Sequence, residues 1–158
     1  MKSLIVYYSY EGSTDVVANL IEEEINGTLL RLKLKKEKEI KSFLKYALGG
    51  KAIMNEKPEL EPININIADY DLIFIGTPIW AFTNAPAINT FISETKIENK
   101  NIALFCTSGG SRGKTFEKLR KNLPNNNFVG ENEFALVYKK EKEELKNEVK
   151  EWLKDIVK

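Results

Sequence analysis

The chain has 158 residues, enough for one domain with a real hydrophobic core. It carries 24 basic and 23 acidic side chains, and this net charge of +1 gives no field that would collect nucleic acid or an anionic membrane surface. With one cysteine, Cys106, no histidine and no apolar stretch of membrane-spanning length, the sequence excludes an internal disulfide, metal sites built from cysteine and histidine, histidine-dependent catalysis and a membrane span.

The first 34 residues predict a strand, a helix and a second strand. SLIVYY, residues 3 to 8, is a short apolar run that ends in a turn, which is typical of a buried central strand. Apolar residues then fall at helical spacing from Ser13 to Ile25, with Ser13 as a candidate N-cap and Asn26-Gly27 as the stop. Residues 28–34 alternate more and predict a strand nearer the edge of a sheet.

Residues 37–66 interrupt this order. They contain a predicted short helix, Ile40 to Leu48, followed by GGKAIMNEKPELEP. We find no repeat, low-complexity segment or linker, so the sequence predicts one domain, residues 1–158, with an insertion at about 37–66.

Three further strands and three further helices are predicted after the insertion. The buried strand DLIFIG leads into TPIWAFTNAP, which we expect to be a loop before a helix that begins near Asn84 and Pro86. The remaining elements are a buried strand at 101–107, a helix marked by Phe116, Leu119 and Leu123, a strand in FVGENEFALVY interrupted around Gly130 to Glu133, and a helix from about Lys140 to Val157. Strands and helices that alternate in this way predict an α/β fold with a doubly wound, five-stranded parallel sheet.

Three loops follow the central predicted strands, and in an open parallel sheet ligands bind beyond the carboxyl ends of the strands. In SYEGST, Gly12 permits a tight turn, Ser9, Ser13 and Thr14 offer hydroxyl groups, and the following helix offers its N-terminus to an anion. The loop lacks Lys and Arg and matches neither a Walker loop nor a dinucleotide fingerprint. Taken alone it is equally consistent with a plain capped turn.

The other two loops suit a flat ring. TPIWAFTN places Trp80 and Phe82 just beyond a strand end, where a planar aromatic ligand would explain such large rings. CTSGGSRG offers the backbone N–H groups of two adjacent glycines to a polar ring edge. Together the three loops predict a ligand that is phosphorylated, planar and aromatic.

These motifs resemble those of the flavodoxin-like family, which binds FMN. YYSYEGST is similar to its phosphate loop, GTPIWAFTNAPAINTF to its aromatic flavin loop in the branch with a G-[TS]-P-[IV]-W motif, and CTSGGS to the loop at the other flavin edge. YALGGKAIMNEKPELEP resembles an insertion common in that branch. The resemblance implies the strand order 2-1-3-4-5, with FMN as cofactor where the strand order reverses.

The resemblance also implies which residues contact FMN. The matching positions are Ser9, Gly12, Ser13 and Thr14 for the phosphate, Pro78, Ile79, Trp80, Phe82 and Thr83 for the flavin ring, and Thr107, Ser108, Gly109 and Gly110 for its other edge. Glu11 departs from the family pattern, which has a hydroxyl residue there. A carboxylate cannot donate to a phosphate, so we expect Glu11 to turn outward and to contribute only its backbone N–H.

Three functions remain open on the sequence. The first is an electron carrier that passes electrons between redox partner proteins, a reductase and an acceptor, through bound FMN. The second is an FMN enzyme that takes hydride from NAD(P)H and reduces a quinone or similar acceptor, and the third is a non-redox module that uses the fold without FMN. The carrier interpretation comes first, although the net charge of +1 differs from the acidic character of many carriers.

The same interpretation expects no nucleic acid, membrane or metal partner and a cytoplasmic location. Cys106 is expected to be a buried small hydrophobic residue. Arg112 is either a partner for the flavin edge or an exposed arginine in the first turn of a helix.

Overall fold

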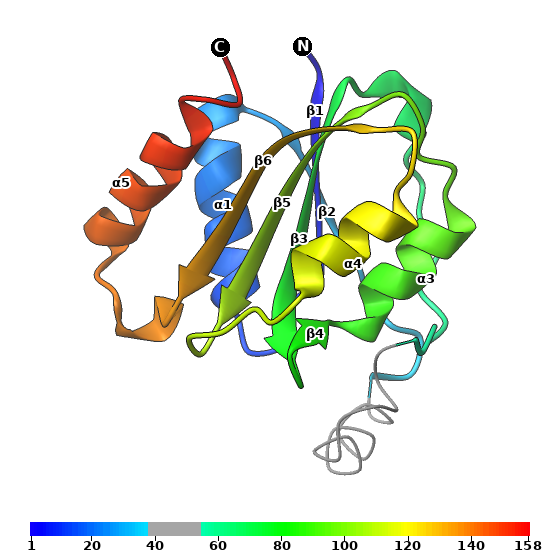
Figure 1. Cartoon of the computed structure of the whole chain (residues 1–158), viewed down its shortest axis with the longest axis horizontal. Helices are drawn as coiled ribbons and strands as arrows, with labels where there is room; N and C mark the ends of the chain where they lie inside the picture. Colours follow the sequence, from blue (N-terminus) through cyan, green and yellow to red (C-terminus); the bar gives the residue numbers. More distant parts are fainter. Residues whose placement is uncertain (38–54) are drawn as a thin grey trace.

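A computed structural model describes residues 1–37 and 55–158 and contains a parallel sheet in the order β2-β1-β3-β5-β6 (Figure 1). The strands are β1 (Ser3–Tyr7), β2 (Thr28–Arg31), β3 (Leu72–Trp80), β4 (Thr83–Asn84), β5 (Asn101–Ser108) and β6 (Asn127–Ala135). The two-residue β4 pairs antiparallel with the end of β3 and lies off this path. The predicted order 2-1-3-4-5 is therefore confirmed, since the fourth and fifth predicted strands are β5 and β6.

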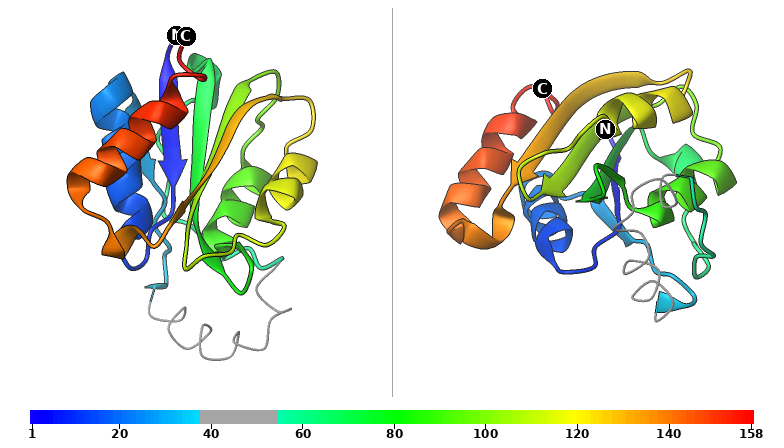
Figure 2. Two further views of the ribbon diagram at one scale, coloured as in Figure 1. Left: turned by 60° about the vertical axis from the view of Figure 1, so that its left-hand side comes forward. Right: turned by 60° about the horizontal axis from the view of Figure 1, so that its bottom comes forward.

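Helices cover both faces of the sheet. They are α1 (Ser13–Ile25), α3 (Pro86–Glu94), α4 (Thr115–Asn122) and α5 (Lys142–Leu153), with short 3-10 helices η1 (Ile67–Asp69) and η2 (Val137–Lys139). The helices α1 and α5 lie on one face and α3 and α4 on the other (Figures 1 and 2). None of the described helices is long and apolar enough to cross a membrane. The predicted helix from Ile40 to Leu48 lies outside the described residues.

Because helices cover both faces of the sheet, the central strands are apolar throughout and do not alternate apolar and polar residues. Along β1, Leu4 and Val6 pack into the core beneath α3 and α4, while Ile5 and Tyr7 pack into the core beneath α1 and α5. All four side chains are buried. Complete burial of each aliphatic side chain contributes about 1.5–3 kcal/mol, so both faces of each strand help to stabilise the sheet.

The segment predicted as a loop after residue 76 is a β-hairpin instead. The strand β3 continues to Trp80, and β4 returns antiparallel from Thr83. The two residues between them, Ala81 and Phe82, have φ values of 48° and 63°. A two-residue hairpin loop with positive φ at both positions matches the right-handed twist of the strands, and Asn or Gly usually supplies it. The sequence has neither residue here, so the usual hairpin signal is missing.

The predicted interruption around Gly130 to Glu133 is confirmed only as a register shift at its start, where Val129 is the extra residue between the pairs Phe128–Ile102 and Gly130–Ala103. The strand β6 runs through these residues and pairs with Ala103–Cys106 of β5, and the register shifts only between Ile102 and Ala103. Gly130 has a packing role, because a Cβ atom at this position would lie 2.5 Å from Cδ1 of Ile156. The glycine therefore marks a close approach of the C-terminal segment to the strand and not a break in it.

The β3 strand offers a sharp test of this packing. Gly76 pairs with Phe105 on β5, and a Cβ atom on Gly76 would overlap the fully buried Phe105 ring. Overpacking of this kind costs about 1–3 kcal/mol or more, so we expect Gly76→Ala to lower the free energy of unfolding by at least that amount in urea denaturation. Gly109→Ala is the matched control, because its added methyl group meets no atom within 4 Å. Equal stability of the two variants would contradict the described packing.

Candidate functional site

The carboxyl ends of β1, β3 and β5 lie at one edge of the sheet, and the loops that follow them surround a cavity of about 290 Å³. Ligand pockets in proteins begin at about 300 Å³, so the cavity is at the lower end of that range. Most of the residues predicted to contact a ligand line it. These are Ser9, Glu11, Ser13, Thr14, Pro78, Ile79, Trp80, Thr107, Ser108 and Gly109.

Four predicted residues do not line the cavity: Gly12, Phe82, Thr83 and Gly110. Gly12 and Gly110 have positive φ values and shape the turns of their loops. Phe82 is 69% exposed at the tip of the hairpin, whereas Thr83 is buried behind it. For all fourteen predicted residues, contact with a ligand stays a prediction.

Three further lining residues were not predicted: Tyr10, Val137 and Tyr138. Val137 and Tyr138 belong to η2, which follows β6. Both residues lie beyond the carboxyl end of β6, at the same edge of the sheet as the three loops. The rule that ligands bind beyond the carboxyl ends of parallel strands would have predicted them if we had applied it to β6 as well. Tyr138 is 71% exposed and forms part of the rim.

The first loop is shaped by its backbone. Gly12 has φ 104°, which favours glycine, and its carbonyl accepts the first helical hydrogen bond from Val16 N at 3.0 Å. The expected N-cap is therefore displaced by one residue: Gly12 caps α1, and Ser13 is its first residue. Ser9 Oγ accepts from Asp15 N at 3.2 Å and takes over the side-chain bond that a capping serine would make.

A buried hydrogen bond joins the first loop to the third. Thr14 Oγ1 lies 2.8 Å from Thr107 Oγ1, and both residues are almost fully buried. Buried hydroxyl groups need partners, and here each supplies the other. The pair fixes the spacing of two loops that are 93 residues apart in sequence.

Aromatic side chains around Trp80 form another part of the cavity wall. The Trp80 ring meets Tyr8 and Tyr10 edge to face, with ring centroids 5.6 Å and 6.0 Å apart. Trp80 itself is half-buried at the end of β3 and lines the cavity. Edge-to-face contacts of this type orient a ring as well as stabilise it, so Trp80 is held in place by its neighbours.

The hairpin that carries Trp80 is anchored at its base. Thr77 Oγ1 accepts from Ala85 N at 2.9 Å and donates to Pro78 O at 2.8 Å. At its far end, Thr83 Oγ1 accepts from Lys118 Nζ at 3.3 Å. Burial lowers the pKa of the Lys118 ammonium, which lies between α4 and the hairpin. These bonds hold the hairpin against the rest of the protein from both sides.

Behind the third loop lies an ion pair. Ser108 Oγ donates to Glu133 Oε1 at 2.6 Å and accepts from Gly110 N at 3.2 Å. The other oxygen of Glu133 lies 3.7 Å from Arg112, whose guanidinium group stacks over the Phe116 ring. Arg112 precedes α4, which begins at Thr115, so its expected place in the first turn of a helix is wrong. The structure shows it instead as a partner of Glu133, which holds Ser108.

Cys106 is fully buried in the core cluster beneath α3 and α4. Burial, with a contribution from Glu133, raises the pKa of its thiol to about 12. The residue stays protonated near neutral pH, and the expectation of a small buried hydrophobic residue is confirmed.

The charge of the cavity wall is unusual for an anion site. Among the described residues that line the cavity there is no Lys or Arg, and Glu11 is the one with a charged side chain. Glu11 is exposed, as expected for a carboxylate that turns toward solvent. An anion here would depend on the N-terminus of α1 and on neutral hydroxyl groups.

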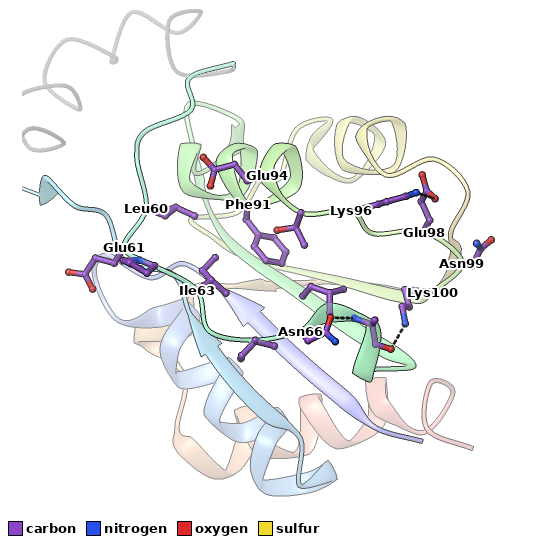
Figure 3. Close-up of a pocket in the computed structure, with 15 residues that line it drawn as sticks. Leu60, Glu61, Ile63, Asn66, Phe91, Glu94, Lys96, Glu98, Asn99 and Lys100 are labelled. Atoms are coloured by element: carbon purple, nitrogen blue, oxygen red, sulfur yellow. Dashed lines mark hydrogen bonds and ion pairs between the residues drawn. The ribbon is translucent and has the colours of Figure 1, made fainter.

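A larger cavity of about 790 Å³ lies elsewhere, between the segment around residues 60–68 and the residues that follow α3 (Figure 3). Its wall mixes Glu61, Glu94, Lys96 and Glu98 with apolar side chains. Lys100 is already engaged, since its Nζ donates to Ala68 O and Tyr70 O at 3.1 Å and 2.6 Å. This cavity extends from Leu60 and Glu61, which pair with the residues that follow β2, to Lys100 at the start of β5. It shares no lining residue with the predicted site.

Comparison with known proteins agrees with the position of the 290 Å³ cavity as a ligand site. A family model described as "Flavodoxin" matches residues 2–156, nearly the whole chain. The chain belongs to the flavodoxin family. In flavodoxin-like sheets of this strand order, the ligand lies where the strand order reverses, between β1 and β3, and the 290 Å³ cavity of this flavodoxin-family protein is at that point.

Several individual proteins are similar to this chain. A flavoprotein from Lactobacillus acidophilus NCFM, solved in complex with FMN, is 28% identical with a TM-score of 0.71, and the match covers 96% of this chain and 97% of that one. A protein of known structure from Bacteroides eggerthii DSM 20697 is 26% identical with a TM-score of 0.78, over 99% of both chains. The flavodoxin-like domain-containing protein BilS from Clostridioides difficile (strain CD3) is 29% identical over 134 residues, which are 82% of this chain and 62% of that protein.

Proposed function

We propose that this protein binds FMN in the 290 Å³ cavity and passes electrons between redox partner proteins. The observation that carries the proposal is the meeting of three loops with complementary chemistry at the reversal point of a flavodoxin-family sheet. The FMN complex of the L. acidophilus flavoprotein, similar over nearly its whole length, supports the choice of cofactor.

The residues present fit FMN in three respects. Ser9, Ser13 and the first turn of α1 would hold the phosphate, because they combine hydroxyl groups with unpaired N–H donors of a helix N-terminus. Trp80 would pack on or beside the ring system. Ser108 and Gly109 border the same cavity and would supply polar contacts to another edge of the ring.

Bound FMN supplies one- and two-electron transfer, which none of the side chains of this site provides. The protein binds the phosphate, orients the ring and limits access of water. Its hairpin is held at Thr77 and Thr83, and its third loop at Ser108, so the walls are set before a ligand arrives. Such preorganisation lowers the entropic cost of binding.

The carrier comes before the reductase, because the sequence has no NAD(P)H fingerprint and electron transfer through a flavin needs no acid or base from the protein. Tyr138 is exposed at the rim of the cavity and Phe82 is exposed at the tip of the hairpin, and both suit contact with a partner surface. The reductase keeps one argument in its favour, the net charge of +1, which gives no strongly acidic surface for docking to basic partners. For location we propose the cytoplasm, where a lone buried thiol stays reduced.

The role of Trp80 is tested by FMN titration of the apoprotein. We expect Trp80→Ala to weaken FMN about fivefold, since an aromatic stacking contact contributes about 1 kcal/mol beyond burial, and to relieve quenching of flavin fluorescence. Trp80→Phe keeps a ring and should lose less. Trp152→Phe is the control for the loss of an indole ring and should leave affinity unchanged, because Trp152 packs against Phe74 and Phe134 and does not line the cavity. Unchanged affinity and fluorescence in Trp80→Ala would place the flavin elsewhere.

The choice between carrier and reductase is tested by anaerobic reduction of the FMN-loaded protein, followed by its visible spectrum. For a carrier, NADH or NADPH alone should reduce the flavin very slowly, and a catalytic amount of a flavoprotein reductase should accelerate the reaction strongly. Rapid multiple turnover of a soluble quinone with NAD(P)H and no partner protein would contradict the carrier and establish the reductase.

A further inference from the structure

Arg31 lies behind the part of the cavity wall where the phosphate would bind, and it does not line the cavity itself. Arg31 ends β2, and its Cα position pairs with Tyr7 at the end of β1. From there the guanidinium group reaches the first loop, and its NH2 donates to Ser9 O at 3.3 Å. Ser9 is a buried residue of the cavity wall. Arg31 therefore touches the first loop without lining the cavity itself.

The same guanidinium group is paired with an acid in the first turn of α1. Arg31 NH1 lies 3.3 Å from Asp15 Oδ1, and Tyr7 OH donates to the same oxygen at 2.6 Å. The Asp15 backbone N–H in turn donates to Ser9 Oγ. Arg31 and Asp15 thus hold Ser9 at its carbonyl and at its hydroxyl.

Asp15 lies in the first turn of α1, two residues after Ser13, and carries a negative charge close to the proposed phosphate position. The described cavity wall supplies no cation, and Glu11 adds a second negative charge at its edge. A carboxylate near a helix N-terminus competes with a bound anion for the positive end of the dipole. Without a partner cation, the Asp15 carboxylate would repel a phosphate bound at the N-terminus of α1.

We propose that Arg31 is a positioning residue that gives the site its selectivity for a phosphorylated flavin: it neutralises Asp15 and places a positive charge against the carbonyl of Ser9. This inference rests on the proposed binding of FMN. It assigns no direct contact between Arg31 and the ligand. Arg31 acts electrostatically on the phosphate group, so it should change the affinity for FMN but not the affinity for an uncharged flavin.

The test compares FMN with riboflavin, which has the same ring system but no phosphate, by fluorescence titration of apoprotein variants. We expect Arg31→Gln to weaken FMN about fivefold at low salt and to leave riboflavin within twofold. The loss should shrink as salt rises, because the interaction is screened. Arg31→Lys keeps the charge and should stay close to wild type. Arg120→Gln is the control, since Arg120 pairs with Glu131 and neither residue lines the cavity.

The double variant Arg31→Gln/Asp15→Asn separates charge from contact. It removes both charges, and the amide oxygen of the substituted side chain would still accept from Tyr7 OH. We therefore expect FMN affinity to return to within about twofold of wild type. Thermal unfolding of every variant checks that the fold is kept.

Three results would overturn the inference: equal weakening of FMN and riboflavin by Arg31→Gln, no weakening of FMN, or no recovery in the double variant. Wild-type protein that binds neither ligand would instead refute the proposed function, and this inference with it. Wild-type protein that binds both equally would refute the inference alone.

Discussion

The site depends on the register of three parallel strands. Gly76 on β3 pairs with Tyr7 on β1 and with Phe105 on β5, so the three strands are level at this line across the sheet. The loops that follow therefore leave the sheet side by side, although they begin about 70 and 100 residues apart along the chain. A shift of one residue in either pairing would turn the strand's side chains to the other face and separate the loops.

Two ion pairs lie behind the wall of the cavity and do not line it. At one end, Arg31 and Asp15 lie behind Ser9. At the other, Glu133 and Arg112 lie behind Ser108. In both places a hydroxyl-bearing residue faces the cavity while an ion pair holds it from behind. Apart from Glu11, the wall is thus neutral and firmly positioned, which suits a ligand whose own charge is confined to one phosphate.

Much of the fold follows from the sequence because both faces of the central strands are buried, which produces unbroken apolar runs such as LIVYY and LIFIG. Most of the cavity wall also follows, since its residues come directly after those runs. Two local features were missed for physical reasons. Ala81 and Phe82 adopt positive φ although neither is the glycine or asparagine that usually marks such a turn in a sequence. Gly130 allows close packing against Ile156, where we expected a break in the strand.

The support of the site was harder to predict than its wall. Arg31 contacts Ser9 and Asp15 across 22 and 16 residues of sequence, and Ser108 meets Glu133 across 25. No local pattern specifies such contacts, because they arise only when the order and register of the strands are known. Composition assigns arginines to the surface, where Arg31 indeed lies, but it does not show which acid each arginine meets.

The central claim is that FMN occupies the cavity at the carboxyl ends of β1, β3 and β5 and not the larger cavity beside α3. The most direct test is a titration of isotope-labelled apoprotein with FMN, followed by the chemical shifts of the backbone amides. The account predicts that the large shifts cluster in residues 9–15, 77–83 and 107–110, with saturation at one FMN per chain. Shifts clustered in residues 60–68 and 94–100, or no saturable shifts at all, would contradict it.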